Sequence, residues 1–215
     1  HHNMKYIYCL LLFCTCVSLK LSAQEELKPL ASIAAFQERL KQEAANIRSI
    51  ESDFTQEKYL DVFSEKVISK GRFYFKQDNM IRMDYSSPLN YLIIINGQKL
   101  KTVSEGKSNV VNLGSNPMMN EMKGMLSACM IGDLNAIGSS YKLEYFETPT
   151  LYVVKIQPTS KSVKAYISEI VISLDKKDMA EKTLRLSEND KDYTEYHFTN
   201  KKYNTLTSDV KFTIR

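Results

Sequence analysis

The chain has 215 residues, of which 43% are hydrophobic and 25% charged, with 29 Lys and Arg against 25 Asp and Glu. This is the composition of an ordinary globular domain, and it excludes a disordered, collagen-like or polytopic membrane protein. A formal charge of +4 spread along the whole chain is no nucleic-acid footprint, so we expect no nucleic acid among its partners.

The first segment, residues 4–23, has the pattern of a secretory signal peptide. Lys5 precedes an apolar run from Tyr6 to Leu19, and small residues follow up to Ala23. The run is shorter than the roughly twenty residues that span a bilayer, although an uncleaved anchor stays an alternative. We therefore expect residues 1–23, including the upstream His1–Asn3, to be a signal peptide. Residues 24–215 are then one domain in the periplasm of a Gram-negative bacterium.

Three of the four cysteines lie in the predicted signal peptide, and Cys129 alone follows it. A single cysteine forms neither an internal disulfide nor a metal cluster. Cys16 is a poor candidate for lipid attachment, because the residues before it are not all small and the apolar run continues beyond it.

Residues 31–47 predict an amphipathic helix, with Ser32 as its cap, because Ile33, Phe36, Leu40 and Ala44 recur at helical spacing. The rest of the chain mostly alternates with a period of two, and Asn96-Gly97 is a strong hairpin signal. Two helical segments, 118–130 and 133–137, interrupt this series. The pattern predicts about eleven antiparallel strands. The twelve segments with this alternation, from which we expect these strands, are residues 53–57, 72–76, 80–85, 91–95, 99–104, 108–113, 140–147, 151–157, 165–174, 182–188, 192–199 and 207–214.

The helical segment 118–130 is rich in methionine, since it holds five of the eight methionines that follow Met4. Methionine is flexible and polarizable, so such a helix can adapt to apolar groups of variable shape. Pro117 and Gly132 bound the segment, as they would a mobile lid. The alternative is that its apolar stripe is ordinary core. The stripe consists of Met118, Met122, Met125, Leu126 and Cys129.

Groups that could carry out catalysis are scarce after residue 23. His197 is the only histidine there, and its strand position points it to water. No Ser-His-Asp or Cys-His set can be assembled, and the acidic residues at 175–178 read as a solvated turn. We therefore expect no enzyme, no metal site and no cofactor, although an envelope lipid or glycan hydrolase stays an alternative.

Four motifs occur in a specific order and spacing. They are residues 54–56 (FTQ), 71–75 (GRFYF), 81–88 (IRMDYSSP) and 95–97 (ING). Together with the closing segment 193–212, they resemble the LolA family of periplasmic lipoprotein carriers, over nearly all of residues 24–215. The resemblance implies an unclosed antiparallel β-barrel with an N-terminal helix and a helical lid over an apolar cavity.

The resemblance also implies a function. Members of the family accept lipoprotein acyl chains from an inner-membrane export complex and carry them towards the outer membrane. Here we expect a monomer whose partners are that complex and lipoprotein acyl chains or another lipid. The residues expected to form the acyl cavity and lid are Phe54, Phe73, Phe75, Ile81, Met83, Tyr85, Met118, Met122, Met125 and Leu126.

One position departs from the family pattern. Many members carry an Arg before the third strand that latches the lid, and this chain has Gln77 there. A glutamine amide donates two hydrogen bonds but lacks the charge and the forked donors of arginine. Gln77 is thus the candidate latch, and a different lipid cargo stays open. A lipid-sensing or partner-binding module on the same barrel is the alternative function.

Overall fold

The structure is a computed structural model that describes residues 25–115 and 117–215, without the side chains of residues 117–119 and 130. The expected signal peptide, residues 1–23, lies outside the described residues. Within the described part of the chain, no helix has both the length and the hydropathy needed to cross a membrane.

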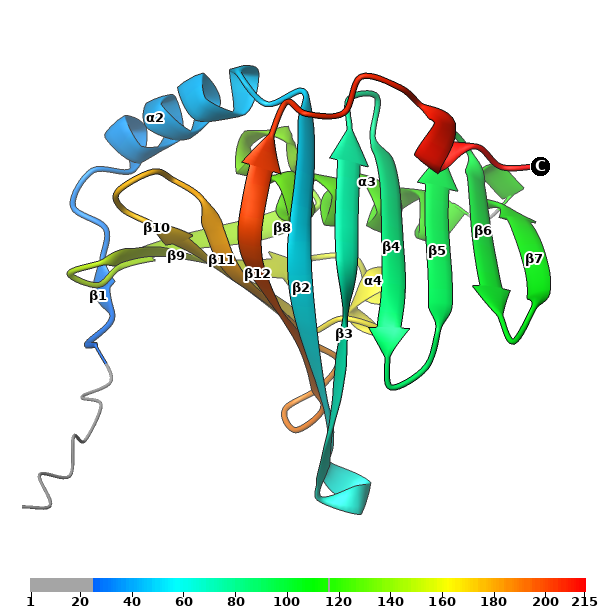
Figure 1. Cartoon of the computed structure of the whole chain (residues 1–215). Helices are drawn as coiled ribbons and strands as arrows, with labels where there is room; N and C mark the ends of the chain where they lie inside the picture. The colour runs from blue at the N-terminus through cyan, green and yellow to red at the C-terminus, as the bar shows by residue number, and fades with distance from the viewer. Residues whose placement is uncertain (1–24, 116) are drawn as a thin grey trace, which may run out of the picture.

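All described strands join one antiparallel sheet of twelve strands, in the order β1-β8-β9-β10-β11-β12-β2-β3-β4-β5-β6-β7. The sheet curls strongly but does not close, so β1 and β7 form its two edges (Figure 1). This confirms the predicted unclosed barrel. The strands are β1 (Lys28–Pro29), β2 (Ser49–Leu60), β3 (Glu65–Lys76), β4 (Met80–Ser87), β5 (Tyr91–Asn96), β6 (Lys99–Ser104), β7 (Lys107–Asn112), β8 (Tyr141–Glu147), β9 (Leu151–Pro158), β10 (Glu169–Asp175), β11 (Glu181–Ser187) and β12 (Tyr193–Tyr203).

Two longer helices lie where the periodicity predicts them. Helix α2 (Ile33–Ala45) begins after Ser32, whose hydroxyl accepts a hydrogen bond from the Ala35 amide at 3.3 Å, as an N-cap does. Helix α3 (Pro117–Ile131) separates β7 from β8 and runs behind β2–β5 in the view of Figure 1. Two further elements are short: α4 (Lys161–Lys164), and a 3₁₀ turn, η3 (Leu134–Ala136), inside the predicted helical segment 133–137.

The alternation of each strand gives the sheet an inner and an outer face. The inner face carries the large apolar core, in which Phe73 pairs with Met83 and Phe54 pairs with Phe198 across neighbouring strands. Phe36 of α2 and Met125 of α3 are buried in the same cluster. Both helices therefore cover the inner face, which holds most of the apolar surface that drives folding.

The predicted strand at residues 207–214 is wrong. This segment crosses the outer face of β3–β5 as an irregular chain with one 3₁₀ turn, η4 (Val210–Phe212), seen in red in Figure 1. Phe212 is fully buried there against Tyr74, Met80 and Ile94. The spacing of the apolar residues in this segment reflects their packing on the outer face. In the described residues its main chain pairs with no neighbouring strand.

Side chains of β4 and β5 bind the main chain of this C-terminal segment instead. Arg82 Nη1 donates to the Lys211 carbonyl at 2.8 Å, and Asn96 Nδ2 donates to the Phe212 carbonyl at 3.0 Å. Buried carbonyl groups need such partners, and here they come from side chains. The segment is thus fixed against the outer wall of the sheet.

We expect Phe212→Ala to destabilise the protein by about 3–5 kcal/mol, because it removes a fully buried aromatic ring and leaves a cavity. Urea unfolding monitored by circular dichroism measures the effect. Val210→Ala, at a side chain that is 73% exposed in the same turn, is the matched control and should cost less than about 0.5 kcal/mol. Equal losses in the two variants would contradict the packing role of Phe212.

Candidate functional site

The six strand residues predicted to line a cavity do lie together on the inner face. The register pairs Phe75 with Ile81 and Phe73 with Met83, and paired residues project from the same face. Phe54 and Tyr85 both pair with Gly71, from opposite sides. All except Tyr85 are buried, so the structure gathers them into one apolar wall across β2, β3 and β4.

Tyr85 marks the polar end of this wall. Its ring meets Phe54 edge-on at 5.0 Å between centroids, and its hydroxyl donates to Gln56 Oε1 at 2.5 Å. Burial raises the pKa of Tyr85, so the hydroxyl stays protonated and acts as a donor. Beyond Tyr85, the side chains of Tyr91 and Ile93 on β5 are only half-buried, so the inner face is more exposed to solvent there.

Helix α3 covers the wall with the predicted methionine stripe. Met125 is 3% exposed, and Met122 and Leu126 are half-buried and pack against the same core. The side chain of Met118 lies outside the described residues. A cleft of about 470 Å³ lies beside α3, lined by Gly124, Met125 and Ala128 of the helix and by Tyr141 across from it. Methionine side chains between a packed wall and a cleft can rearrange at low cost.

The candidate latch, Gln77, does not reach α3 in its described hydrogen bonds. Its side-chain amide donates to the Ile47 carbonyl at 3.2 Å, and its main-chain N–H donates to the Arg48 carbonyl at 2.9 Å. Gln77 therefore ties the β3–β4 turn to the connection between α2 and β2.

A different residue ties α3 to the sheet. The Lys123 ammonium donates to the Gly97 carbonyl in the β5–β6 turn, and burial lowers the pKa of Lys123. The only sequence signal for this contact is that Lys123 is the one basic residue of α3.

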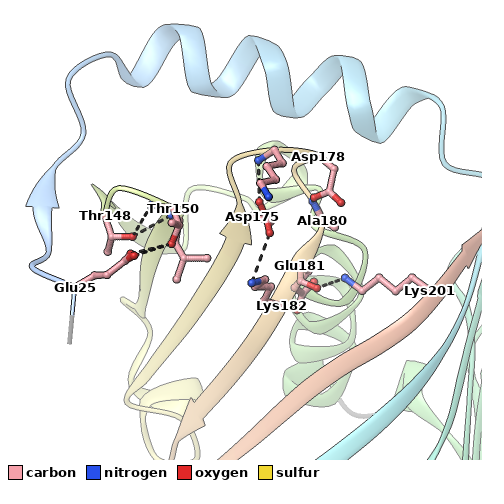
Figure 2. Close-up of polar contacts among 11 residues, drawn as sticks. Glu25, Thr148, Thr150, Asp175, Asp178, Ala180, Glu181, Lys182 and Lys201 are labelled. Carbon is pink, nitrogen blue, oxygen red and sulfur yellow. Dashed lines mark hydrogen bonds and ion pairs between the residues drawn. The ribbon is translucent and has the colours of Figure 1, made fainter. Parts of the chain in front are cut away.

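The sequence also did not predict a buried acid, Glu181, at the start of β11. The residue is 6% exposed, and neither carboxylate oxygen has a hydrogen-bond partner among the described residues. Figure 2 shows Lys201 reaching from β12 to the main-chain carbonyl of Glu181. Burial raises the pKa of Glu181 well above its ordinary value of 4.5, and burial also lowers the pKa of Lys201. The predicted strand, residues 182–188, begins one position after Glu181, and its periodicity gives no sign that this acid is buried.

The residues considered for catalysis remain apart. His197 is 44% exposed on the outer face, with Nε2 at 2.9 Å from a Glu195 oxygen. Cys129 is fully buried in α3, and burial raises the pKa of its thiol, which makes it a poor nucleophile. Among the described side chains, no three acidic, His or Cys residues are grouped so that they could hold a metal ion.

Comparison with known families agrees with this geometry. The model of the LolA family, described as outer membrane lipoprotein carrier protein LolA, matches residues 45–215. The chain belongs to the LolA family. The match includes the whole sheet except β1, as well as α3 and the C-terminal segment, and leaves out nearly all of α2. No curated protein sequence matches the chain significantly.

Solved structures share the fold at low sequence identity. An uncharacterized conserved protein from Thermus thermophilus superposes with a TM-score of 0.52 at 10% identity, over 84% of this chain and 94% of that chain. A DUF1329 family protein from Desulfovibrio piger gives 0.50 at 13% identity, over 83% and 95%. A LolA superfamily protein from Nitrosomonas europaea gives 0.44 at 10% identity, over 83% and 97%.

The buried acid predicts a pH dependence of stability. Because the folded-state pKa of Glu181 is raised, the unfolded chain loses its proton first as the pH rises above about 4.5, and folding stability falls. Glu181→Gln removes this term. We expect the variant to gain stability relative to the wild type between pH 4.5 and 8, measured by urea unfolding.

Neighbouring groups sharpen this expectation. Burial raises the pKa values of Cys129 and Tyr203, the latter to about 12, so both stay uncharged over this range, and Lys201 is the charged neighbour. Glu188→Gln, at an exposed acid just after β11, is the control. If the two substitutions change the pH profile equally, Glu181 is not held protonated.

Proposed function

We propose that this protein is a carrier of the bacterial cell envelope that holds lipoprotein acyl chains, or the chains of a related lipid, against the inner face of its sheet. The observation that carries the proposal is the apolar wall of β2–β4 under a single methionine-bearing helix, in a chain of the LolA family. An unclosed barrel allows this cover to move without breaking strand pairing.

The physical need for a carrier is large. Burying an acyl chain of roughly sixteen carbons contributes about 0.8 kcal/mol per CH₂, or about 12 kcal/mol in total. Such a chain cannot cross an aqueous compartment exposed, so a protein must enclose it. Release into a membrane also requires that the protein hold the chain no more tightly than lipid does. An adaptable methionine surface with few fixed polar groups suits this balance.

In the present state the interior is filled by side chains of the protein itself, including Met125 of α3. We infer that α3 must shift before an acyl chain can enter. Lys123 restrains the helix through Gly97, and Gln77 holds the adjoining connection through Ile47. We propose these two contacts as the latch of the resting state.

The proposed route follows the family. The acyl chains would come from an inner-membrane lipoprotein export complex and travel across the periplasm towards the outer membrane. The predicted signal peptide, residues 1–23, supports this location, and we propose that the protein acts as a monomer without catalytic chemistry.

Release of a lipoprotein from inner-membrane vesicles tests the proposal. The protein should transfer the lipoprotein into the soluble fraction as a one-to-one complex, which native mass spectrometry identifies by its mass. Vesicles from which the export complex has been removed are the control. A protein that stays free of lipoprotein and of any co-purifying lipid would rule out carriage.

Met122→Asp tests the methionine cover. A carboxylate against the apolar wall is costly unless it is paired, so binding of a fluorescent acyl-chain probe should weaken by at least about tenfold. Asn120→Asp places the same charge at an exposed position of α3 and should leave binding unchanged. Probe binding by Met122→Asp at wild-type affinity would mean that α3 is ordinary core and no lid.

Lys123→Met tests the latch. Losing the bond to Gly97 should speed probe uptake by about two- to tenfold, since an exposed hydrogen bond such as this one contributes about 0.5–1.5 kcal/mol net. Stopped-flow fluorescence measures the uptake rate. Lys99→Met, at an exposed lysine of the neighbouring strand, is the control. An unchanged uptake rate in Lys123→Met would remove Lys123 from the latch.

A further inference from the structure

The carboxyl group of Glu181 lines a small cavity beneath α3. The cavity has a volume of about 20 Å³, enough for one water-sized polar group. Both carboxylate oxygens of Glu181 are buried without a partner among the described residues. Burying a carboxyl group without a hydrogen-bond partner costs folding free energy. We therefore expect Glu181 to have a partner that the described protein groups do not include.

The neighbouring protein groups do not supply that partner. Lys201 is half-buried beside the carboxyl group, but its ammonium donates to the main-chain carbonyl of Glu181. Cys129 approaches from α3, and Tyr203 lies further along β12, yet neither forms a described hydrogen bond with the carboxyl group. Two groups that can donate, the protonated carboxyl of Glu181 and the ammonium of Lys201, therefore lie together (Figure 2). The hydroxyl of Ser52, also in the cavity lining, donates to the Asp53 carbonyl at 2.7 Å and forms no described hydrogen bond with the Glu181 carboxyl group.

The cavity beside Glu181 and Lys201 has a polar end near the surface and an apolar end in the interior. Tyr203 is 42% exposed and leads to the surface between α2 and β12. Apart from Ser52, the other walls are mostly apolar and continue into the core of the inner face. They are formed by Ile47, Ile50, Phe73, Ile131 and Phe198. A polar end near the surface with an apolar interior beyond it matches an amphiphile with a single small head group.

We propose that Glu181 and Lys201 form a binding site for the carboxylate of a long-chain fatty acid, whose hydrocarbon chain enters the interior beneath α3. This inference rests on the proposed function, because the chain would occupy the same apolar space as the lipoprotein acyl chains. Entry requires the side chains around Ile131 to move aside, since the present cavity has room for about one water molecule and must widen to take the head group and the chain.

The chemistry of the pair selects a carboxylate. The Glu181 O–H would donate to one ligand oxygen, and Lys201 would turn from the main-chain carbonyl to the other. Hydrogen bonds to a charged acceptor are shorter and about twice as strong as neutral ones. The ligand's negative charge would also offset the charge of the half-buried Lys201. An ester lacks this charge.

Comparison of palmitate with methyl palmitate tests the site, with both ligands delivered from cyclodextrin at pH 7.4 to the whole protein. We expect palmitate to bind at least tenfold more tightly than its methyl ester. Palmitate labelled with ¹³C at its carboxyl carbon should keep the chemical shift of a carboxylate when bound at pH 5.5, because Lys201 stabilises the charged form.

Variants assign the effect to the pair. Lys201→Met should remove the preference for palmitate over the ester, whereas Lys202→Met, at the exposed neighbouring lysine, should keep it. Glu181→Gln retains an N–H donor and should keep most of the preference, while Glu181→Leu should lose it. The comparison of ligands on the wild type stands even if Glu181→Leu fails to fold.

The outcomes separate the two proposals. Equal affinity for palmitate and its ester would overturn the carboxylate site and leave acyl carriage intact. Binding of neither ligand would overturn the carriage of acyl chains as well. A preference for palmitate that survives Lys201→Met would place the recognised carboxylate elsewhere and also overturn the assignment.

Discussion

The structure depends on one constraint: a curled sheet that does not close has a single inner face that must be kept from water. Twelve antiparallel strands alternate so that their large apolar side chains meet on this face, and the open edges prevent the sheet from sealing itself. Helices α2 and α3 therefore complete the core. Since no strand pairing involves α3, this helix can be displaced without breaking the hydrogen bonds of the sheet.

The covering helix differs in character from the wall that it covers. The wall is built mainly from aromatic and Ile side chains, with Met83, and cross-strand register fixes their positions, whereas α3 contributes methionines and one lysine contact to a turn. A rigid wall with an adaptable cover is suited to ligands of variable shape.

Much of this arrangement follows from local patterns in the sequence. Period-two alternation placed Phe73, Phe75, Ile81 and Met83 on one face, since neighbours in an antiparallel pair share a face once the register is known. The helical period gave α2 and α3 with nearly correct ends. These features depend on residues close in sequence, and so they are visible without the fold.

Features that depend on distant contacts were missed. The segment around Phe212 alternates like a strand, but it lies on the outer face, where side chains from β4 and β5 bind its carbonyl groups. The burial of Glu181 depends on α3 and β12, which no local pattern brings beside it. The contact of Lys123 with Gly97 likewise joins residues that are 26 positions apart.

The C-terminal segment has a consequence for how the molecule is assembled. It joins Lys211 and Phe212 to residues of β4 and β5 that precede them by 129 and 116 positions. Contacts between such distant residues form slowly, because the intervening chain must first be ordered. Until residues 205–215 pack against the outer wall, Tyr74 and Ile94 face water and remain available for aggregation. A segment that is synthesised well after β3, β4 and β5 thus protects these strands.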